Sequence, residues 1–232
     1  MSLPYDMFFV RHGYSELNAV HSPIKEYLDN LKRLRWSKVD LGHFTDEEFL
    51  GRGRSEYRLV KKGREQARAA GEWLISNINL PADAYYLSPY LRAVETAYYL
   101  GIDGAQWDVT PHLREQMWGD LARLSDREKL KAYKQSLEDR KVDSFFWTPP
   151  GWGGESMDAY CRNVIDPMLD TLRRKHDGQR VILVTHGGLM MGVRARLERL
   201  LQPEYRQIML SKNLFDRINN GQIMHYSRIN PE

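Results

Sequence analysis

The chain has 232 residues, of which 42% are hydrophobic and 28% are charged, and its formal net charge is +3. This length and apolar content suit one domain with a sizeable core, and no apolar run approaches the roughly 20 residues that span a bilayer. The single cysteine, Cys161, excludes an internal disulfide framework, and no Cys/His group has zinc-site spacing. We therefore expect one domain over residues 1–232 in a reducing cytoplasm, with no metal site and no membrane partner. Because only six residues precede the first expected strand, we also expect no signal peptide.

The positive charge is concentrated in one segment. Residues 22–64 contain 11 lysines and arginines against 7 acidic residues, whereas the rest of the chain is almost balanced. A local basic excess attracts anionic substrates, although a solvated basic face explains it equally well. No nucleic-acid motif accompanies the excess, so we expect no nucleic-acid partner.

The first expected element is a buried strand at Met7–Val10, and it ends abruptly in Arg11-His12-Gly13. In open α/β sheets, ligands bind at the carboxyl ends of strands, and a glycine there allows close approach of the backbone. Ser15 and Asn18 follow as short polar groups that suit a helix cap or an anion. This stretch is therefore a candidate binding site.

A long irregular segment follows, and after it comes an expected helix. Ser22–Tyr57 is too long for a simple connection, and we expect a cap insertion over the strand ends. Lys61–Asn77 has the spacing of an amphipathic helix with Ala67, Ala70, Trp73 and Leu74 on one face.

A strand at Ala84–Leu87 is expected to lead into a helix at Leu91–Leu100 that stops at Gly101. Ser88 and Pro89 suit the cap and first turn of this helix. Arg92 then lies near a helix N-terminus, where anions bind, whereas surface pairing with Glu95 is the alternative.

The middle of the chain contains a second expected lid segment at residues 116–152. Before it, Gln106–Thr110 predicts a short strand that leads to Leu113-Arg114-Glu115. Inside it, Ser125–Arg140 is rich in charges and predicts an exposed helix whose capping box is Ser125 with Glu128.

The last third begins with an expected helix at Ser156–His176, which Ser156 caps and Pro167 kinks. Val181–Thr185 is a second buried strand, and it ends in His186-Gly187-Gly188. Asn219-Asn220-Gly221 separates two strand-like runs, Asn213–Ile218 and Gln222–Tyr226, and Asn-Gly in that position predicts a hairpin.

Together these elements predict an α/β fold with three layers. The sheet is mainly parallel with helices on both faces, and the C-terminal β-hairpin lies at its edge. One histidine after a strand would more often be structural, but two in matching contexts favour a shared site for His12 and His186. Two histidines and two arginines that face one point make a phosphate pocket.

Five motifs occur in the order typical of one family, and they extend over most of the chain. Through them the chain resembles the histidine phosphatase superfamily, in its phosphoglycerate-mutase-like branch. The motifs are Arg11-His12-Gly13 with Ser15 and Asn18, Ser88-Pro89-Tyr90-Leu91-Arg92-Ala93 with Thr96-Ala97, Leu113-Arg114-Glu115, Gly153-Gly154-Glu155-Ser156, and Thr185-His186-Gly187-Gly188. Ser22–Tyr57 does not match the family pattern, so a relative's substrate does not transfer directly.

The resemblance implies a metal-independent phosphomonoesterase that needs no cofactor and hydrolyses a small phosphorylated metabolite. It implies that His12 becomes a phosphohistidine, that Glu115 is the general acid and then the base, and that His186 steadies the phosphoryl charge. The further groups expected around the phosphate are Arg11, Arg92, Ser15, Asn18 and Gly187.

Other functions remain open at this point. A mutase would return the phosphoryl group to another hydroxyl of the same substrate, and a phosphoprotein phosphatase or a non-catalytic phospho-ligand-binding protein would use the same scaffold. Glycolytic mutases carry an Arg-Tyr-Gly stretch where this chain has Gly119–Leu124, which favours hydrolysis. Either a monomer or a homodimer is compatible with the sequence.

Overall fold

The computed structural model describes residues 2–21, 55–122, 124, 126–211, 213 and 216–228. Most of the predicted cap insertion, residues 22–54, lies outside these ranges. The predicted cap at Ser125 lies outside them too, so both stay predictions.

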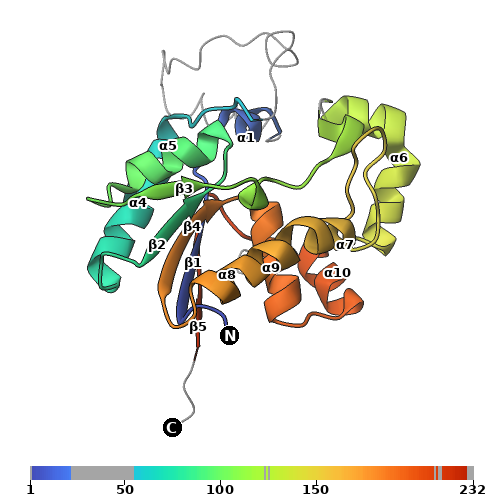
Figure 1. Cartoon of the computed structure of the whole chain (residues 1–232). Coiled ribbons are helices and arrows are strands. Elements are labelled where there is room, and N and C mark those ends of the chain that lie inside the picture. Colours follow the sequence, from blue (N-terminus) through green and yellow to red (C-terminus); the bar gives the residue numbers. More distant parts are fainter. Residues whose placement is uncertain are drawn as a thin grey trace, which may run out of the picture.

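A five-stranded sheet in the order β3-β2-β4-β1-β5 forms the centre of the molecule (Figure 1). β1 (Asp6–Arg11) pairs in parallel with β4 (Arg180–Thr185). β2 (Ala84–Leu87) pairs in parallel with β4, and β3 (Trp107–Val109) pairs in parallel with β2. β5 (Ile223–Ser227) lies antiparallel to β1 at the edge. The predicted three-layer, mainly parallel architecture is confirmed.

Helices cover both faces of this sheet (Figure 1). On one face, α4 (Lys61–Asn77) and α5 (Leu91–Leu100) pack over Phe8, Val10 and neighbouring apolar residues. On the other face, the buried residues of α9 (Gly187–Leu197) pack with Phe9. Phe8 and Phe9 thus point to opposite faces, as successive residues of a strand do, and both strand faces are buried.

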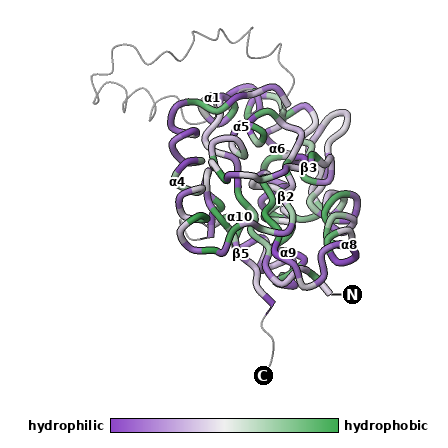
Figure 2. Tube along the Cα trace, turned by 60° about the vertical axis from the view of Figure 1, so that its left-hand side comes forward, coloured by the Kyte–Doolittle hydropathy of each residue, from purple (hydrophilic) through white to green (hydrophobic). Residues whose placement is uncertain are grey.

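α4 begins and ends where its periodicity predicts, and Ala67, Ala70 and Leu74 are buried against the sheet. Trp73 was predicted on the same face but is 44% exposed. Its position next to Leu74 turns it toward the edge of the apolar stripe, and much of the helix is hydrophilic (Figure 2).

The predicted long helix at Ser156–His176 is interrupted. α7 (Met157–Tyr160) is followed by a π-helical turn, η3 (Cys161–Ile165), and then by α8 (Asp166–Lys175). The expected cap is present, since the Ser156 hydroxyl accepts a hydrogen bond from the Ala159 N–H at 3.1 Å. The wider turn comes just before Pro167, whose ring cannot donate a backbone hydrogen bond inside a helix.

One predicted detail near a strand end is wrong. Ser88 and Pro89 lie before α5, whose N-cap is Tyr90 and carries no side-chain cap. Arg92 lies in the first turn of α5, as predicted, and the alternative of a surface residue paired with Glu95 is excluded, because Arg92 is 1% exposed and Glu95 pairs with Arg58 at 2.6 Å.

The predicted hairpin is only half correct. β5 is the expected antiparallel edge strand, but among the described residues of that region Asn213 and residues 216–222 lie in turns and coil. Gly221 has φ +75°, and its N–H donates to the carbonyls of Arg11 and His12 at 3.2 and 3.3 Å. The Asn-Gly turn therefore binds the end of β1 instead of joining two strands.

The remaining elements lie outside the sheet (Figure 1). They are α1 (Glu16–His21), the short 3-10 helices η1 (Pro111–Leu113) and η2 (Gly119–Ala122), α6 (Asp126–Val142) and α10 (Gln202–Leu210). α6 is the charged helix expected within residues 116–152, and it lies to one side of the sheet (Figure 1). A lid role for that segment stays a prediction. Within the part of the chain that the structure describes, no helix is long and apolar enough to cross a membrane.

Candidate active site

The two histidines meet at one end of the sheet. Arg11 and Thr185 are paired in the β1–β4 register, so the residues that follow them, His12 and His186, leave neighbouring strands side by side. Their ring centroids are 5.1 Å apart with an interplanar angle of 64°. The structure thus brings together two residues that are far apart in the sequence.

His12 is held with one nitrogen protonated and the other available. Its Nδ1 lies 2.7 Å from the Gly13 carbonyl, which can only accept, so Nδ1 carries the proton. Its Nε2 then has the lone pair and accepts a hydrogen bond from Arg92 Nε at 3.0 Å. The side chain is nearly buried, with 3% of its surface exposed.

The surroundings of His12 keep it neutral. Burial, followed by the charges of Arg92 and Arg11, holds the pKa of His12 well below its ordinary value of 6.5, against a smaller opposing effect of the Gly13 carbonyl. A neutral imidazole with a fixed Nδ1 proton presents a nucleophilic lone pair at physiological pH.

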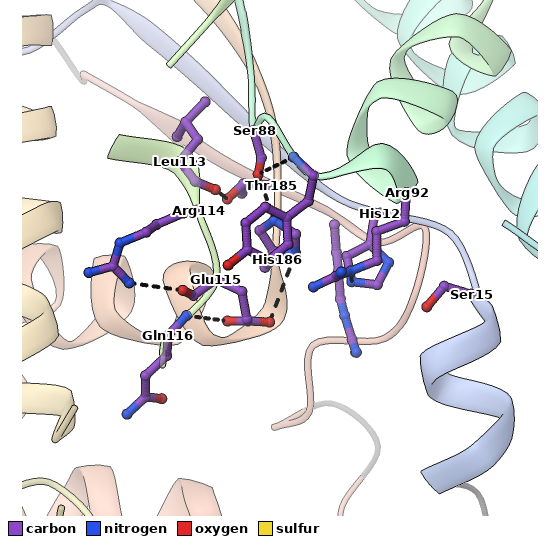
Figure 3. Close-up of polar contacts among 12 residues, drawn as sticks. His12, Ser15, Ser88, Arg92, Leu113, Arg114, Glu115, Gln116, Thr185 and His186 are labelled. Atoms are coloured by element: carbon purple, nitrogen blue, oxygen red, sulfur yellow. Dashed lines mark hydrogen bonds and ion pairs between the residues drawn. The ribbon is translucent and has the colours of Figure 1, made fainter. Parts of the chain in front are cut away.

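His186 has different partners (Figure 3). Its Nε2 is hydrogen-bonded to the Ser88 hydroxyl at 2.8 Å, and its Nδ1 lies 4.0 Å from Oε2 of Glu115. The Ser88 hydroxyl also accepts from the Tyr90 N–H at 3.3 Å. Ser88 therefore uses its oxygen to shape the turn and to orient His186, which explains why it does not cap α5.

Two arginines make the pocket positive. Arg92 is fully buried, and its guanidinium lies over the Tyr90 ring, 4.9 Å from the centroid. Arg11 Nη1 donates to the Ile218 carbonyl, while Arg11 Nε has no hydrogen-bond partner among the described residues. Burial lowers the pKa of Arg11, and the Glu115 carboxylate opposes that effect. A fully buried and a half-buried guanidinium beside a neutral imidazole favour a bound anion.

Ser15 and Asn18 support this pocket from the first turn after β1. The N–H and hydroxyl of Ser15 donate to Asn18 Oδ1 at 3.1 and 2.9 Å. Asn220 Nδ2 donates to the same oxygen at 3.2 Å and to the His12 carbonyl at 3.1 Å. The Asn18 oxygen is thus occupied by protein donors, and its amide nitrogen is the end that can donate to an anion. Ser15 acts on Asn18, and its predicted phosphate contact stays a prediction.

Gly187 and Gly188 make room at the start of α9. A Cβ at Gly187 would lie 3.1 Å from Arg11 Nε, and a Cβ at Gly188 would lie 2.3 Å from Oε1 of Glu115. The Arg11 and Glu115 side chains therefore lie against the N-terminus of α9, and the first N–H groups of a helix attract anions.

Glu115 reaches the site from the loop that follows η1. Its Oε1 accepts a hydrogen bond from the Gln116 N–H at 3.0 Å, and the side chain is 17% exposed. It therefore lies beside His186, on the side away from His12 (Figure 3). A carboxyl group in this place can exchange protons with a leaving group or a water molecule.

Sequence reasoning missed three residues that contact the histidines or Arg92. Ser88 was interpreted as a helix cap, Asn220 as part of a hairpin turn, and Tyr90 had no role. Tyr90 packs against His186 with ring centroids 4.9 Å apart and also contacts Arg92. Its position between Ser88 and Arg92 in one motif was the available signal. Among the described residues, no group of three or more His, Cys, Asp or Glu side chains is arranged to hold a metal ion.

Comparison with known proteins places the chain in a family. The model of the histidine phosphatase superfamily (branch 1) matches residues 45–215, which include Arg92, Glu115 and His186; His12 precedes the matched range. A metal-independent phosphoserine phosphatase of Arabidopsis thaliana is 32% identical over 154 residues, covering 62% of this chain and 60% of that protein. A 2,3-bisphosphoglycerate-dependent phosphoglycerate mutase of Parvibaculum lavamentivorans is 27% identical over 207 residues, covering 87% and 84%.

Solved structures show the same fold. The native structure of a mycobacterial glucosyl-3-phosphoglycerate phosphatase superposes with a TM-score of 0.66 at 21% identity, over 95% of this chain and 89% of that one. At this identity the similarity concerns the fold alone.

Proposed function

The chain belongs to the histidine phosphatase superfamily, and we propose that it hydrolyses the phosphate monoester of a small metabolite through a phosphohistidine on His12, without a metal ion. The observation that carries this proposal is the state of His12. Its Nδ1 proton is fixed on the Gly13 carbonyl, and its Nε2 lone pair lies beside Arg92 in a positive pocket.

In the first step, the phosphate group binds the guanidiniums of Arg11 and Arg92 and draws the Arg92 donor away from His12. His12 Nε2 then attacks phosphorus, and the bond to the ester oxygen breaks. Glu115 gives its carboxyl proton to the leaving oxygen, and His186 stabilises the charge on the transferring phosphoryl group. Positive groups placed in advance are the main requirement of such a loose transition state.

In the second step, water splits the phosphohistidine. The Glu115 carboxylate, which has just lost its proton, accepts a proton from the attacking water. The phosphorus–nitrogen bond breaks, inorganic phosphate leaves and neutral His12 is restored. The same residues therefore serve both halves of the reaction.

The relatives support this reaction class. One carries the name metal-independent phosphoserine phosphatase, and a structural neighbour is titled a glucosyl-3-phosphoglycerate phosphatase. Both names describe phosphate monoesters of small polar molecules, and we propose a substrate of that class in the cytoplasm, acted on by a monomer or a homodimer.

The test is hydrolysis of p-nitrophenyl phosphate in EDTA by wild type, His12→Ala and Glu115→Ala. We expect turnover by the wild type and none by His12→Ala, and acid-labile phosphate trapped on His12 after rapid quenching. Undiminished hydrolysis by His12→Ala rejects the proposal. Hydrolysis of phosphopeptides but not of metabolites redirects it to a phosphoprotein phosphatase, and binding of phosphate esters without turnover redirects it to a binding protein.

A mutase is the second candidate, because the Parvibaculum relative bears that name and covers most of this chain. It would return the phosphoryl group from His12 to a hydroxyl of the substrate. Incubation with 3-phosphoglycerate and 2,3-bisphosphoglycerate separates the two functions. Rapid isomerisation with little free phosphate would establish the mutase, whereas phosphate release supports the phosphatase.

A further inference from the structure

Glu155 is a buried carboxylate near the site that touches none of the reacting groups. It is 8% exposed and forms two parallel hydrogen bonds with Arg114, from Nη2 to Oε1 at 2.9 Å and from Nη1 to Oε2 at 3.0 Å. Bidentate pairs of this kind are both strong and geometrically specific. Burial of a carboxylate costs desolvation free energy, so we expect this carboxylate to have a specific role.

The contacts of Glu155 surround Glu115. Its Oε2 accepts from the Met117 N–H at 3.3 Å, and its own N–H donates to the Met117 carbonyl at 3.0 Å. Its carbonyl accepts from Gln116 Nε2 at 2.8 Å. Arg114 Nη1, besides its bond to Glu155, donates to the Glu115 carbonyl at 3.0 Å. Every residue from 114 to 117 is thus tied to Glu155, directly or through Arg114.

This segment has little other regular structure to hold it. η1 ends at Leu113 and η2 begins at Gly119, so Glu115 lies on a loop between two single turns. The Glu115 carboxyl takes its hydrogen bond from the Gln116 backbone N–H. A shift of this backbone therefore moves the carboxyl, and a misplacement of about 1 Å in a reacting group lowers rates by about 100-fold.

We propose that Glu155 is a positioning residue for Glu115. Through Arg114 and the backbone of residues 116 and 117, it holds the Glu115 carboxyl where it exchanges protons with the leaving oxygen. This inference rests on the proposed function, because it takes Glu115 as the general acid. Loss of the Glu155 charge then impairs proton transfer and spares binding and nucleophilic attack by His12.

The leaving group provides the test, because a good leaving group needs no proton and a poor one does. We compare kcat/KM for p-nitrophenyl phosphate and phenyl phosphate, which have the same ring and differ in leaving-group basicity. Glu155→Gln is expected to stay within about threefold of wild type on the nitrophenyl ester and to fall about 100-fold on the phenyl ester. Glu155→Asp is expected to recover part of the loss.

The matched control is Asp166→Asn, which removes another bidentate carboxylate–arginine pair, with Arg196 at 2.9 and 3.0 Å. It is expected to leave the ratio of the two kcat/KM values unchanged. Because Glu155→Gln alone leaves the Arg114 charge unpaired, the double variant Arg114→Gln/Glu155→Gln is measured as well. It removes both charges and is expected to show the same selective loss.

Equal losses on both esters, or no loss on phenyl phosphate, in a folded Glu155 or double variant overturn the inference and leave the proposed function standing. Hydrolysis that survives His12→Ala, or no hydrolysis by folded wild type, rejects the proposed function and the inference with it. The thermal unfolding midpoint of each variant separates a loss of fold from a loss of positioning.

Discussion

His12 and His186 follow neighbouring central strands, each is followed by glycine, and both are buried. Their partners nevertheless differ. His12 lies between Gly13 and the guanidinium of Arg92, whereas His186 lies between the Ser88 hydroxyl and the Glu115 carboxylate. His12 thus lies next to positive charges, whereas His186 lies between a hydroxyl group and a carboxylate.

The comparison shows that equivalent places in a sheet do not confer equivalent chemistry. The turn between β2 and α5 supplies the difference, because Ser88 at its start orients His186 and Arg92 in the first turn of the helix binds His12. One short motif thus serves both histidines, and Tyr90 between them packs against His186 and Arg92.

Replacement of the nucleophile is expected to have the largest effect. His12→Ala should lower kcat on p-nitrophenyl phosphate by about 10⁴-fold or more, because no other group forms the covalent intermediate. Steady-state rates and rapid-quench trapping measure this. A kcat within tenfold of wild type would show that His12 is not the nucleophile.

His186→Ala is expected to cost less, about 10²- to 10³-fold in kcat, because it removes charge stabilisation and leaves the nucleophile in place. The phosphohistidine should still form on His12 and should be trapped by acid-free quenching and mass spectrometry. Absence of that adduct, with the protein folded, would contradict the division of roles.

Arg92→Gln is expected to lower kcat/KM by about 100-fold through loss of a phosphate donor. It also removes a charge that lowers the pKa of His12, so this pKa should rise toward 6.5. Since only neutral His12 attacks, activity is lost as the pH falls through that pKa, and the acid limb should move to higher pH. An NMR titration of the His12 ring measures the shift. Arg58→Gln, which changes an exposed arginine paired with Glu95, is the control and should leave the titration unchanged.

Ser88→Ala is expected to have the smallest effect, about tenfold in kcat/KM, because it removes one hydrogen bond that orients His186. The titration of His12 should not change, since Ser88 belongs to the other histidine. The control is Ser136→Ala in α6, which removes a hydroxyl that accepts a hydrogen bond from Trp147 Nε1. A shift of the His12 titration in Ser88→Ala would show that the two histidines are coupled.

Local patterns predicted the regular elements well. The bounds of α4, β2 and α5 follow from apolar spacing and from the left-handed Gly101 that ends α5. Two of the errors lie where a residue has a distant partner. The first strand of the predicted hairpin was wrong because the Asn-Gly turn binds the end of β1, and the Ser88 cap was wrong because the hydroxyl bonds His186.

The sequence by itself determined that two buried strands end in His-Gly and that Arg92 enters a helix after a third strand, because these are patterns of neighbouring residues. Only the tertiary structure decided which groups form hydrogen bonds with His12 and His186. Arg92 is 80 residues from His12, Ser88 is 98 from His186 and Asn220 is 208 from His12. Hydrogen bonds depend on tenths of an ångström and on angle, and these are set by how the sheet and its helices pack.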